Sequence, residues 1–224
     1  MTCFISIPNR ITEDLAEETG WHIGDGSMNF YKNRGKLRGI YQLRGHIVDD
    51  REHYLRRVKP IFLSVYAINV NFREMPSTRV YGFQIWSDEL VKFKNGLGLP
   101  LGKKTNVSIP PVFLKKGKHK VAVIRGIFDT DGGIYLEKKN NKLYPRIEIR
   151  TISQILANQI LYILQELGFR ATKHSELTNK KYNRNRTYVL SVRGNEMFDK
   201  WMKIIDPKNP KHEMKYFTYR KTFK

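Results

Sequence analysis

The most constraining feature of this 224-residue sequence is that much of it occurs twice. The segment 79–89 aligns without a gap with 186–196, at an offset of 107 residues. Offsets of 106 or 107 residues also match charged residues of the first copy with identical types in the second: Asp25 with Asp131, Arg44 with Arg150, and Lys104 with Lys211. Two long copies are too few for a solenoid, so they predict two halves related by a pseudo-twofold axis.

Each half is predicted to run helix, two strands, helix, two strands, helix, in an α+β fold. The predicted helices are 12–24, 50–65 and 87–95 in the first half, and 119–130, 153–167 and 194–204 in the second. The predicted strands are 28–32, 37–46, 66–73 and 79–86, followed by 134–139, 144–151, 169–174 and 186–193. The proline-containing stretch 96–118 cannot continue a helix and is expected to connect the halves. We place the boundary near residue 110, which divides the chain into 1–109 and 110–224.

Two of the predicted helices carry small residues at every fourth position and end in Asp-Gly. The small residues are Ala16, Gly20 and Gly24 in one helix, and Ala122, Gly126 and Thr130 in the other. Glycine inside a helix costs about 1 kcal/mol relative to alanine, so its presence needs a reason. A close crossing of the two helices supplies that reason, and it would bring Asp25 and Asp131 side by side at the helix C-termini.

Paired carboxylates at helix C-termini repel each other and oppose the helix dipole. A divalent cation stabilises such a pair, and carboxylate oxygens are the ligands that Mg²⁺ prefers. In a DNA-cutting site the cation would activate a water and neutralise the charge that builds on the scissile phosphate. A lone Asp-Gly more often only closes a helix with a turn. The repetition is what favours a metal site.

The motif segments resemble those of a known family. Residues 125–132, Arg-Gly-Ile-Phe-Asp-Thr-Asp-Gly, look like a LAGLIDADG motif, and 19–26, Thr-Gly-Trp-His-Ile-Gly-Asp-Gly, resembles the more divergent first motif of single-chain LAGLIDADG homing endonucleases. The resemblance covers nearly the whole chain. It implies two pseudo-symmetric αββαββα halves, antiparallel sheets that form a saddle over DNA, and a central interface of the two motif helices.

The resemblance also implies a metal site. It assigns metal binding to Asp25 and Asp131, and we expect the backbone carbonyls of Gly24 and Thr130 as further ligands. Mg²⁺ is the expected cofactor, with Mn²⁺ able to substitute and Ca²⁺ binding without supporting cleavage. Asp129 is left out of this set, because the first motif has isoleucine at the matching position.

Lys104 and Lys211 are candidate catalytic residues. Most lysines in such loops are merely solvated. In the resembling family, however, a basic residue of each half approaches the central site, and the repeat matches these two lysines with each other. A nearby ammonium could polarise the attacking water or steady the phosphate.

Polar residues alternate along the strand that follows each motif helix. A solvated strand face gives the same pattern, but Arg44 and Arg150 both lie nineteen residues after their aspartates, which favours a symmetric DNA-facing surface. Arginine, glutamine and glutamate can read base edges in the major groove. The expected base contacts are Arg38, Gln42, Arg44, Arg146, Glu148 and Arg150. The other expected DNA contacts, mostly with phosphates, are Lys32, Arg34, Lys36, Arg79, Lys138, Lys139, Arg184 and Arg186. His46 either touches the scissile region or only ends its strand.

The charge balance points to a polyanionic partner. The chain has 41 Lys and Arg against 21 Asp and Glu, a formal net charge of +20 that attracts nucleic acid and opposes self-association. A ribosome-associated or merely high-pI protein is the plainer alternative. The single cysteine, Cys3, excludes a disulfide framework and indicates a reducing interior. Since no export or membrane signal is apparent, we expect an intracellular monomer that binds double-stranded DNA without an obligate protein partner.

The predicted function is therefore a site-specific homing endonuclease that makes a metal-dependent double-strand break in a long asymmetric DNA target. An RNA-splicing maturase and a non-catalytic DNA-binding protein of the same fold are the alternatives. Neither needs both carboxylates. An intein-embedded form is disfavoured, because the endonuclease pattern leaves no segment for a splicing domain.

Overall fold

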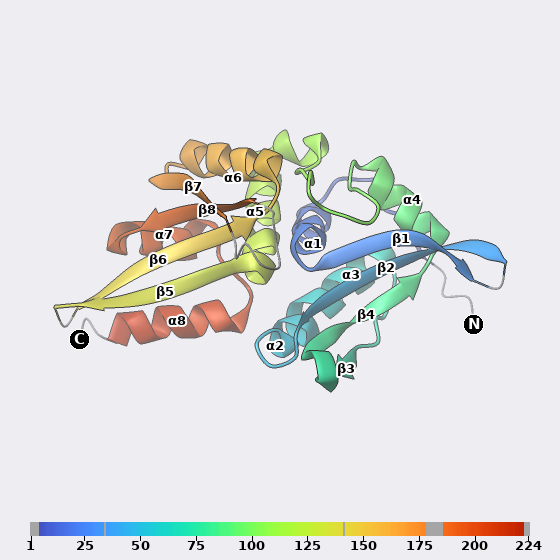
Figure 1. The fold of residues 1–224 in the computed structure, drawn as a ribbon, viewed down its shortest axis with the longest axis horizontal. Helices are drawn as coiled ribbons and strands as arrows, with labels where there is room; N and C mark the ends of the chain where they lie inside the picture. The colour runs from blue at the N-terminus through green and yellow to red at the C-terminus, as the bar shows by residue number, and fades with distance from the viewer. Residues whose placement is uncertain (1–4, 34, 141, 178–185, 222–224) are drawn as a thin grey trace.

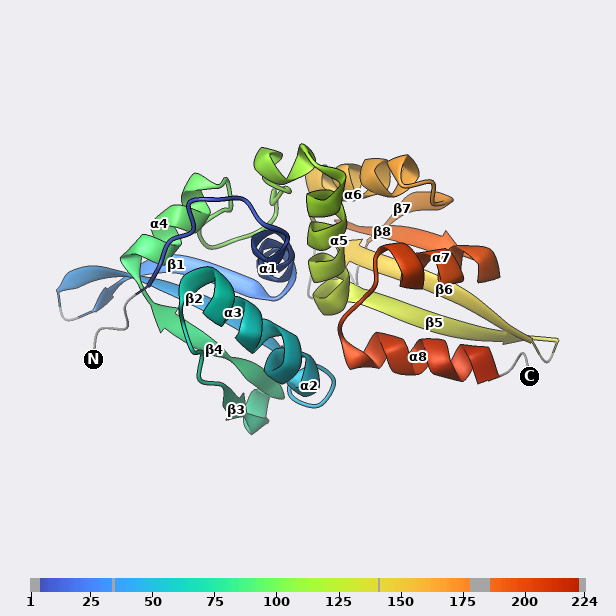
Figure 2. The ribbon, with the colours of Figure 1, turned by 180° about the vertical axis from the view of Figure 1, so that it is seen from behind.

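The computed structural model describes residues 5–33, 35–140, 142–177 and 186–221. Two four-stranded antiparallel sheets lie on either side of a central pair of helices, α1 and α5 (Figure 1). Seen from behind, α3 covers one sheet, and α7 lies over the other with α8 running beside β5 (Figure 2). The predicted α+β fold of two similar halves is confirmed.

The elements follow the predicted order. The first half contains α1 (Glu13–Gly24), β1 (Gly26–Asn33), β2 (Lys36–His46), α2 (Arg51–His53), α3 (Lys59–Tyr66), β3 (Arg73–Met75), β4 (Val80–Trp86) and α4 (Asp88–Gly96). The second contains α5 (Gly117–Asp131), β5 (Gly132–Lys139), β6 (Lys142–Thr151), α6 (Gln154–Glu166), β7 (Ala171–Leu177), β8 (Arg186–Arg193), α7 (Asn195–Ile204) and α8 (Pro210–Lys221). A single π-helical turn, Tyr54–Val58, joins α2 and α3 into the one helix that the sequence predicts there.

The internal repeat extends to the pairing of individual residues. The strand orders are β1-β2-β4-β3 and β5-β6-β8-β7. Gly26 pairs with Leu43 in the first sheet, and the residues 106 positions later, Gly132 and Ile149, pair in the second. Because a slip of one residue would turn every side chain to the opposite face, equal registers place matched residues on the same face of both sheets.

Two elements differ from the predictions. The strand expected at 66–73 is wrong: α3 ends at Ala67 in the left-handed conformation, and the strand is only Arg73–Met75. Ile68 and Val70 are buried from an extended connection, which produces the same alternation as a strand. The sequence also did not predict α8, which offers little to the core beyond His212 and Tyr219.

The two motif helices cross as closely as their small residues predict. A Cβ added to Gly126 would lie 2.1 Å from the Glu17 carbonyl oxygen, and one added to Gly20 would lie 2.4 Å from the Val123 carbonyl oxygen. No side chain fits at such distances, so glycine is what permits the contact. Buried charge joins the halves as well, since Arg125 of α5 donates to Glu17 of α1 at 3.0 Å.

Local signals start α1 at the right place. The Thr12 side chain accepts a hydrogen bond from the backbone N–H of Leu15 at 3.1 Å, and Glu13 and Asp14 follow in the first turn. This cap satisfies an N–H that would otherwise have no partner inside the helix. Among the helices of the described segments, none is long and apolar enough to cross a membrane.

Candidate active site

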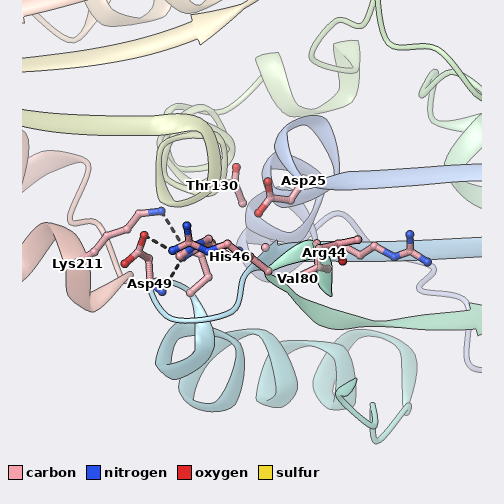
Figure 3. Close-up of a pocket in the computed structure, with 11 residues that line it drawn as sticks. Asp25, Arg44, His46, Asp49, Val80, Thr130 and Lys211 are labelled. Carbon is pink, nitrogen blue, oxygen red and sulfur yellow. Dashed lines mark hydrogen bonds and ion pairs between the residues drawn. The ribbon is translucent and has the colours of Figure 1, made fainter. Parts of the chain in front are cut away.

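The motif helices end together at the centre of the molecule. Asp25 caps the C-terminus of α1 and Asp131 is the last residue of α5. A Cβ added to Gly24 would lie 2.0 Å from the Thr130 hydroxyl oxygen and 3.3 Å from the carboxyl carbon of Asp131. The Asp131 side chain therefore rests against the last turn of α1, and Figure 3 shows Asp25 beside Thr130.

Both carboxyl groups bind protons more tightly than usual. Burial, together with the nearby charge of Asp131 and of Asp50, raises the pKa of Asp25 from 3.8 to about 8. Partial loss of water from its surroundings also raises the pKa of Asp131, to about 6, although this residue is exposed to solvent on one side. Lys104 and Lys211 partly offset the rise in both groups. The ionised pair is thus an unfavourable arrangement, and a cation would relieve it.

Lys104 lies against the end of α1. Its ammonium donates to the carbonyl oxygens of Ile23 at 2.8 Å, of His22 at 3.3 Å, and of Gly24. These oxygens carry the negative end of the helix dipole, which favours a cation there. Burial lowers the pKa of Lys104, while the charges of Asp131 and Asp25 oppose that shift. The Gly24 oxygen, expected as a metal ligand, is already engaged by this ammonium.

Lys211 reaches the site from the opposite half. It lies in the first turn of α8, and its ammonium donates to the Asp50 carboxylate at 2.9 Å. The loop that carries it is fixed by Asp129, whose carboxylate accepts the backbone N–H groups of Lys208 and Asn209 at 3.0–3.1 Å. Burial raises the pKa of Asp129 to about 7, against these two hydrogen bonds, which lower it. Asp129 therefore acts in the structure as the anchor of the lysine loop.

An open cleft of about 550 Å³ lies at the two helix ends (Figure 3). Its walls come from both halves and are formed by Asp25, Arg44, Gly45, His46, Asp49, Asp50, Thr78, Arg79, Val80, Thr130 and Lys211. The structure thus brings six of the predicted site residues to one cavity: Asp25, Thr130, Lys211, Arg44, His46 and Arg79.

The donor set fits a divalent cation that has few protein ligands. Within the described segments, no group of three or more His, Cys, Asp and Glu side chains could hold a metal ion. Asp25 and Asp131 are instead two carboxylates with raised pKa values, and neither is neutralised by a direct ion pair with a described side chain. Mg²⁺ usually binds through one or two carboxylates and keeps several waters, so two carboxylates beside an open cleft suit it.

Comparison with known proteins agrees with the motifs. A family model described as a LAGLIDADG-like domain matches residues 118–206. Solved structures with the same architecture include I-DmoI in complex with DNA and Ca, with a TM-score of 0.61 at 16% identity, covering 86% of this chain and 88% of that one. The meganuclease I-AabMI bound to uncleaved DNA has a TM-score of 0.51 at 11% identity, covering 87% and 85%. Residues 118–206 thus match the LAGLIDADG-like family, and the fold of the chain is that of these two structures.

The curated relatives of this chain are much longer proteins that match it over only part of their length. An uncharacterized protein of Methanocaldococcus jannaschii is 28% identical over 197 residues, which cover 85% of this chain and 21% of the relative. The replication factor C small subunit of the same organism is 30% identical over 184 residues, covering 82% and 9%. The chain spans about a fifth or less of the length of these relatives.

The predicted base-contacting residues lie on the outer faces of the two sheets, but in unlike settings. In the first sheet Arg38 and Arg44 are exposed, and Gln42 donates to the side chain of Gln84 at 3.3 Å. In the second sheet Glu148 is only 2% exposed, and its carboxylate pairs with Arg146 at 2.9 Å and Arg150 at 3.0 Å. In this arrangement Glu148 orients two arginines and does not itself face solvent.

The predicted phosphate-contacting residues sit toward the ends of the strands. The side chains of Lys32, Lys36, Arg79, Lys138 and Arg186 are exposed. Arg79 adopts a left-handed backbone conformation with φ 55°, and Arg186 donates to the Ser175 hydroxyl at 2.9 Å. Arg34 and Arg184 lie outside the described residues, as does the side chain of Lys139.

Sequence reasoning missed Asp50 and Asn209. Asp50 is 5% exposed and Asn209 is fully buried, and the Asn209 amide donates to Asp50 at 2.8 Å. The sequence offered one sign of this role for Asp50: an acidic residue soon after a strand, with Gly45 nearby leaving room for its side chain. Comparison of the two repeats could not find Asp50 or Asn209, because neither residue matches an identical one in the other half.

Proposed function

We propose that this chain is a site-specific endonuclease that makes a divalent-metal-dependent double-strand break in a long, asymmetric DNA target. The observation that carries the proposal is the meeting of Asp25 and Asp131, with raised pKa values, at the ends of two tightly crossed helices. A purely structural pair of acids has no reason to be kept where helix dipole, burial and mutual repulsion all disfavour it. The family and the DNA complexes of I-DmoI and I-AabMI support this proposal.

In the proposed site each group has one task. Asp25 and Asp131 would hold the cation, with the backbone carbonyls of Thr130 and Gly24 as further ligands, the latter only in the absence of its present contact with Lys104. A cation bound there would neutralise charge at the scissile phosphate and lower the pKa of the attacking water. Lys104 and Lys211 bring fixed positive charge to the phosphate from opposite halves. Mg²⁺ is the proposed cofactor, with Mn²⁺ as a substitute and Ca²⁺ as a non-productive ligand; I-DmoI is known as DNA complexes with Ca and with Mn.

The outer sheet faces are the proposed DNA-binding surface. A net charge of +20 drives the approach to the phosphate backbone, which positions the protein without reading sequence. Arg38, Gln42 and Arg44 would then contact base edges in the major groove from the first half. The unlike chemistry of the two sheets supports an asymmetric target, read by halves 1–109 and 110–224 of one monomer.

The experiment is a cleavage assay on the duplex that joins the sequences flanking the gene. Wild-type protein with Mg²⁺ is expected to convert this duplex to two fragments, whereas Asp25→Asn and Asp131→Asn each reduce the rate at least a hundredfold, on the order expected for groups that hold the charge-stabilising ion. Asp14→Asn, in the half-buried first turn of α1, is the matched control for loss of one carboxylate. Wild-type protein that binds the duplex but leaves it intact with Mg²⁺ and with Mn²⁺ would refute the proposal and favour a non-catalytic DNA-binding protein. Splicing of a structured intron RNA that survives both substitutions would favour a maturase.

A further inference from the structure

The two site lysines occupy equivalent places in the repeat but are held by different partners. Lys104 is bound by backbone carbonyls at the end of α1. Lys211 is bound by a side-chain carboxylate, that of Asp50, which comes from the other half. Since a lysine has a flexible four-carbon stem, its partner decides where the ammonium sits.

Asp50 is built into its position. It ends the connection between β2 and α2, is 5% exposed, and uses both oxygens. One accepts from Lys211 at 2.9 Å and from Asn209 at 2.8 Å, and the other accepts from the backbone N–H of His46 at 2.7 Å. A Cβ added to Gly45 would lie 2.7 Å from that second oxygen, so the glycine leaves room for the acid.

Among the residues that the structure describes, no side-chain carboxylate accepts a hydrogen bond from Lys104. The residue 106 positions after Asp50 is Leu156, which is buried in α6 and has no polar side-chain atom. Asp50 therefore breaks the pseudo-symmetry at the point where the halves meet. A buried carboxylate must be well hydrogen-bonded to be tolerated, and both side-chain donors to this one, Asn209 and Lys211, come from the start of α8 and the loop before it.

We propose that Asp50 is a positioning residue that holds Lys211, and its loop, over the cleft from the opposite half of the molecule. The proposal rests on the proposed nuclease function. Under it, the two DNA strands meet differently supported lysines, one per half. Loss of Asp50 consequently slows the cleavage of one strand and leaves the other close to its normal rate.

The test follows nicking of each strand separately, with a duplex that carries a different label on each strand. Asp50→Asn is compared with Lys211→Met, with the double variant, and with Asp206→Asn as control. Asp206 pairs with Lys208 in the same loop and has φ 53°, a conformation that asparagine also adopts readily, so the control removes the same charge nearby. Asp50→Asn is expected to slow one strand by roughly ten- to a hundredfold. The double variant should be no slower on that strand than Lys211→Met alone.

A second measurement does not depend on cleavage. The rate of Lys211 acetylation by acetic anhydride, followed by mass spectrometry, should rise several-fold in Asp50→Asn, while that of Lys208 is unchanged. Equal strand rates and equal Lys211 labelling in Asp50→Asn and in the control would overturn the inference. So would an equal slowing of both strands together with a lowered melting temperature, which marks a purely structural role. If wild-type protein cuts nothing, the nuclease proposal fails, and the labelling still decides whether Asp50 holds Lys211.

Discussion

Replacing Asp25 with asparagine should make the metal-free protein more stable. The folded state binds the Asp25 proton more tightly than the unfolded chain, because burial and nearby acids raise its pKa from 3.8 to about 8. For a group shifted in this direction, the stability present below the unfolded pKa is lost as pH rises toward the folded pKa. The affected window is therefore about pH 4 to pH 8. Asparagine resembles the protonated acid and does not titrate, so it removes this loss.

The size of the effect follows from the same shift. At pH 7 the proton must be taken up against an unfolded pKa near 3.8, which costs on the order of 4 kcal/mol. For a chain of this length, that corresponds to a rise in melting temperature of roughly 8–16 °C. At pH 4, close to the unfolded pKa, protonating the carboxyl costs little, and the difference should fall below about 1 kcal/mol.

Thermal unfolding of wild type and Asp25→Asn in EDTA, at pH 4 and pH 7, measures this difference directly. Asp49→Asn serves as the control, since Asp49 lines the same cleft but its side chain is 61% exposed. Saturating Mg²⁺ should stabilise the wild type and not the variant. A variant that is no more stable than wild type at pH 7, or one whose advantage is the same at pH 4, would refute the electrostatic reasoning about the site.

Further predictions follow from other contacts. Gly126→Ala should lower the free energy of unfolding in urea by at least about 2 kcal/mol, because its Cβ would meet the Glu17 carbonyl oxygen at 2.1 Å. Gly96→Ala is the control, since a Cβ there has no atom within 4 Å and should leave this free energy almost unchanged. Equal effects of the two changes would contradict the close crossing. Glu17→Gln leaves Arg57 and Arg125 without their buried carboxylate and should lower the free energy of unfolding, measured by thermal unfolding, by about 3–5 kcal/mol. A decrease of less than about 1 kcal/mol would contradict a stabilising role of these ion pairs. At limiting Mg²⁺, the cleavage rate should rise between about pH 6 and pH 8, because protons compete with the cation for the two site aspartates. Tenfold more Mg²⁺ should move the midpoint of this pH profile to lower pH. A midpoint that does not change with the Mg²⁺ concentration would exclude this competition. Lys104→Met should slow cleavage at least about tenfold while gel-shift binding in Ca²⁺ is kept, and an unchanged rate would remove this lysine from the site.

The repeat made the fold and the centre of the site predictable. Small residues at every fourth position predicted the crossing at Gly20 and Gly126, because that pattern has few other uses in a water-exposed chain. The crossing in turn fixed where Asp25 and Asp131 lie. Register followed as well, since matched strand residues keep their face in both sheets.

Contacts between unmatched residues could not be predicted in the same way. Asp50 and Asn209 are 159 positions apart, and each is unremarkable in its own segment. Glu148 alternates with apolar residues like a solvent-facing residue, yet two arginines close over it. Burial of a strand's polar face depends on its neighbours in space, which local periodicity does not contain. The choice between a strand and an extended connection before β3 failed for the same reason.

The segment between the halves has a role beyond joining them. Gly102 donates to the carbonyl oxygen of Met28 at 2.9 Å, and Ile109 donates to the side chain of Gln159 at 2.8 Å, so the segment is tied to the first sheet on one side and to α6 on the other. Lys104 lies between these two ties. The length of this segment is consequently constrained when halves of two such chains are fused, because an insertion between residues 102 and 109 would move Lys104 away from the helix end it touches.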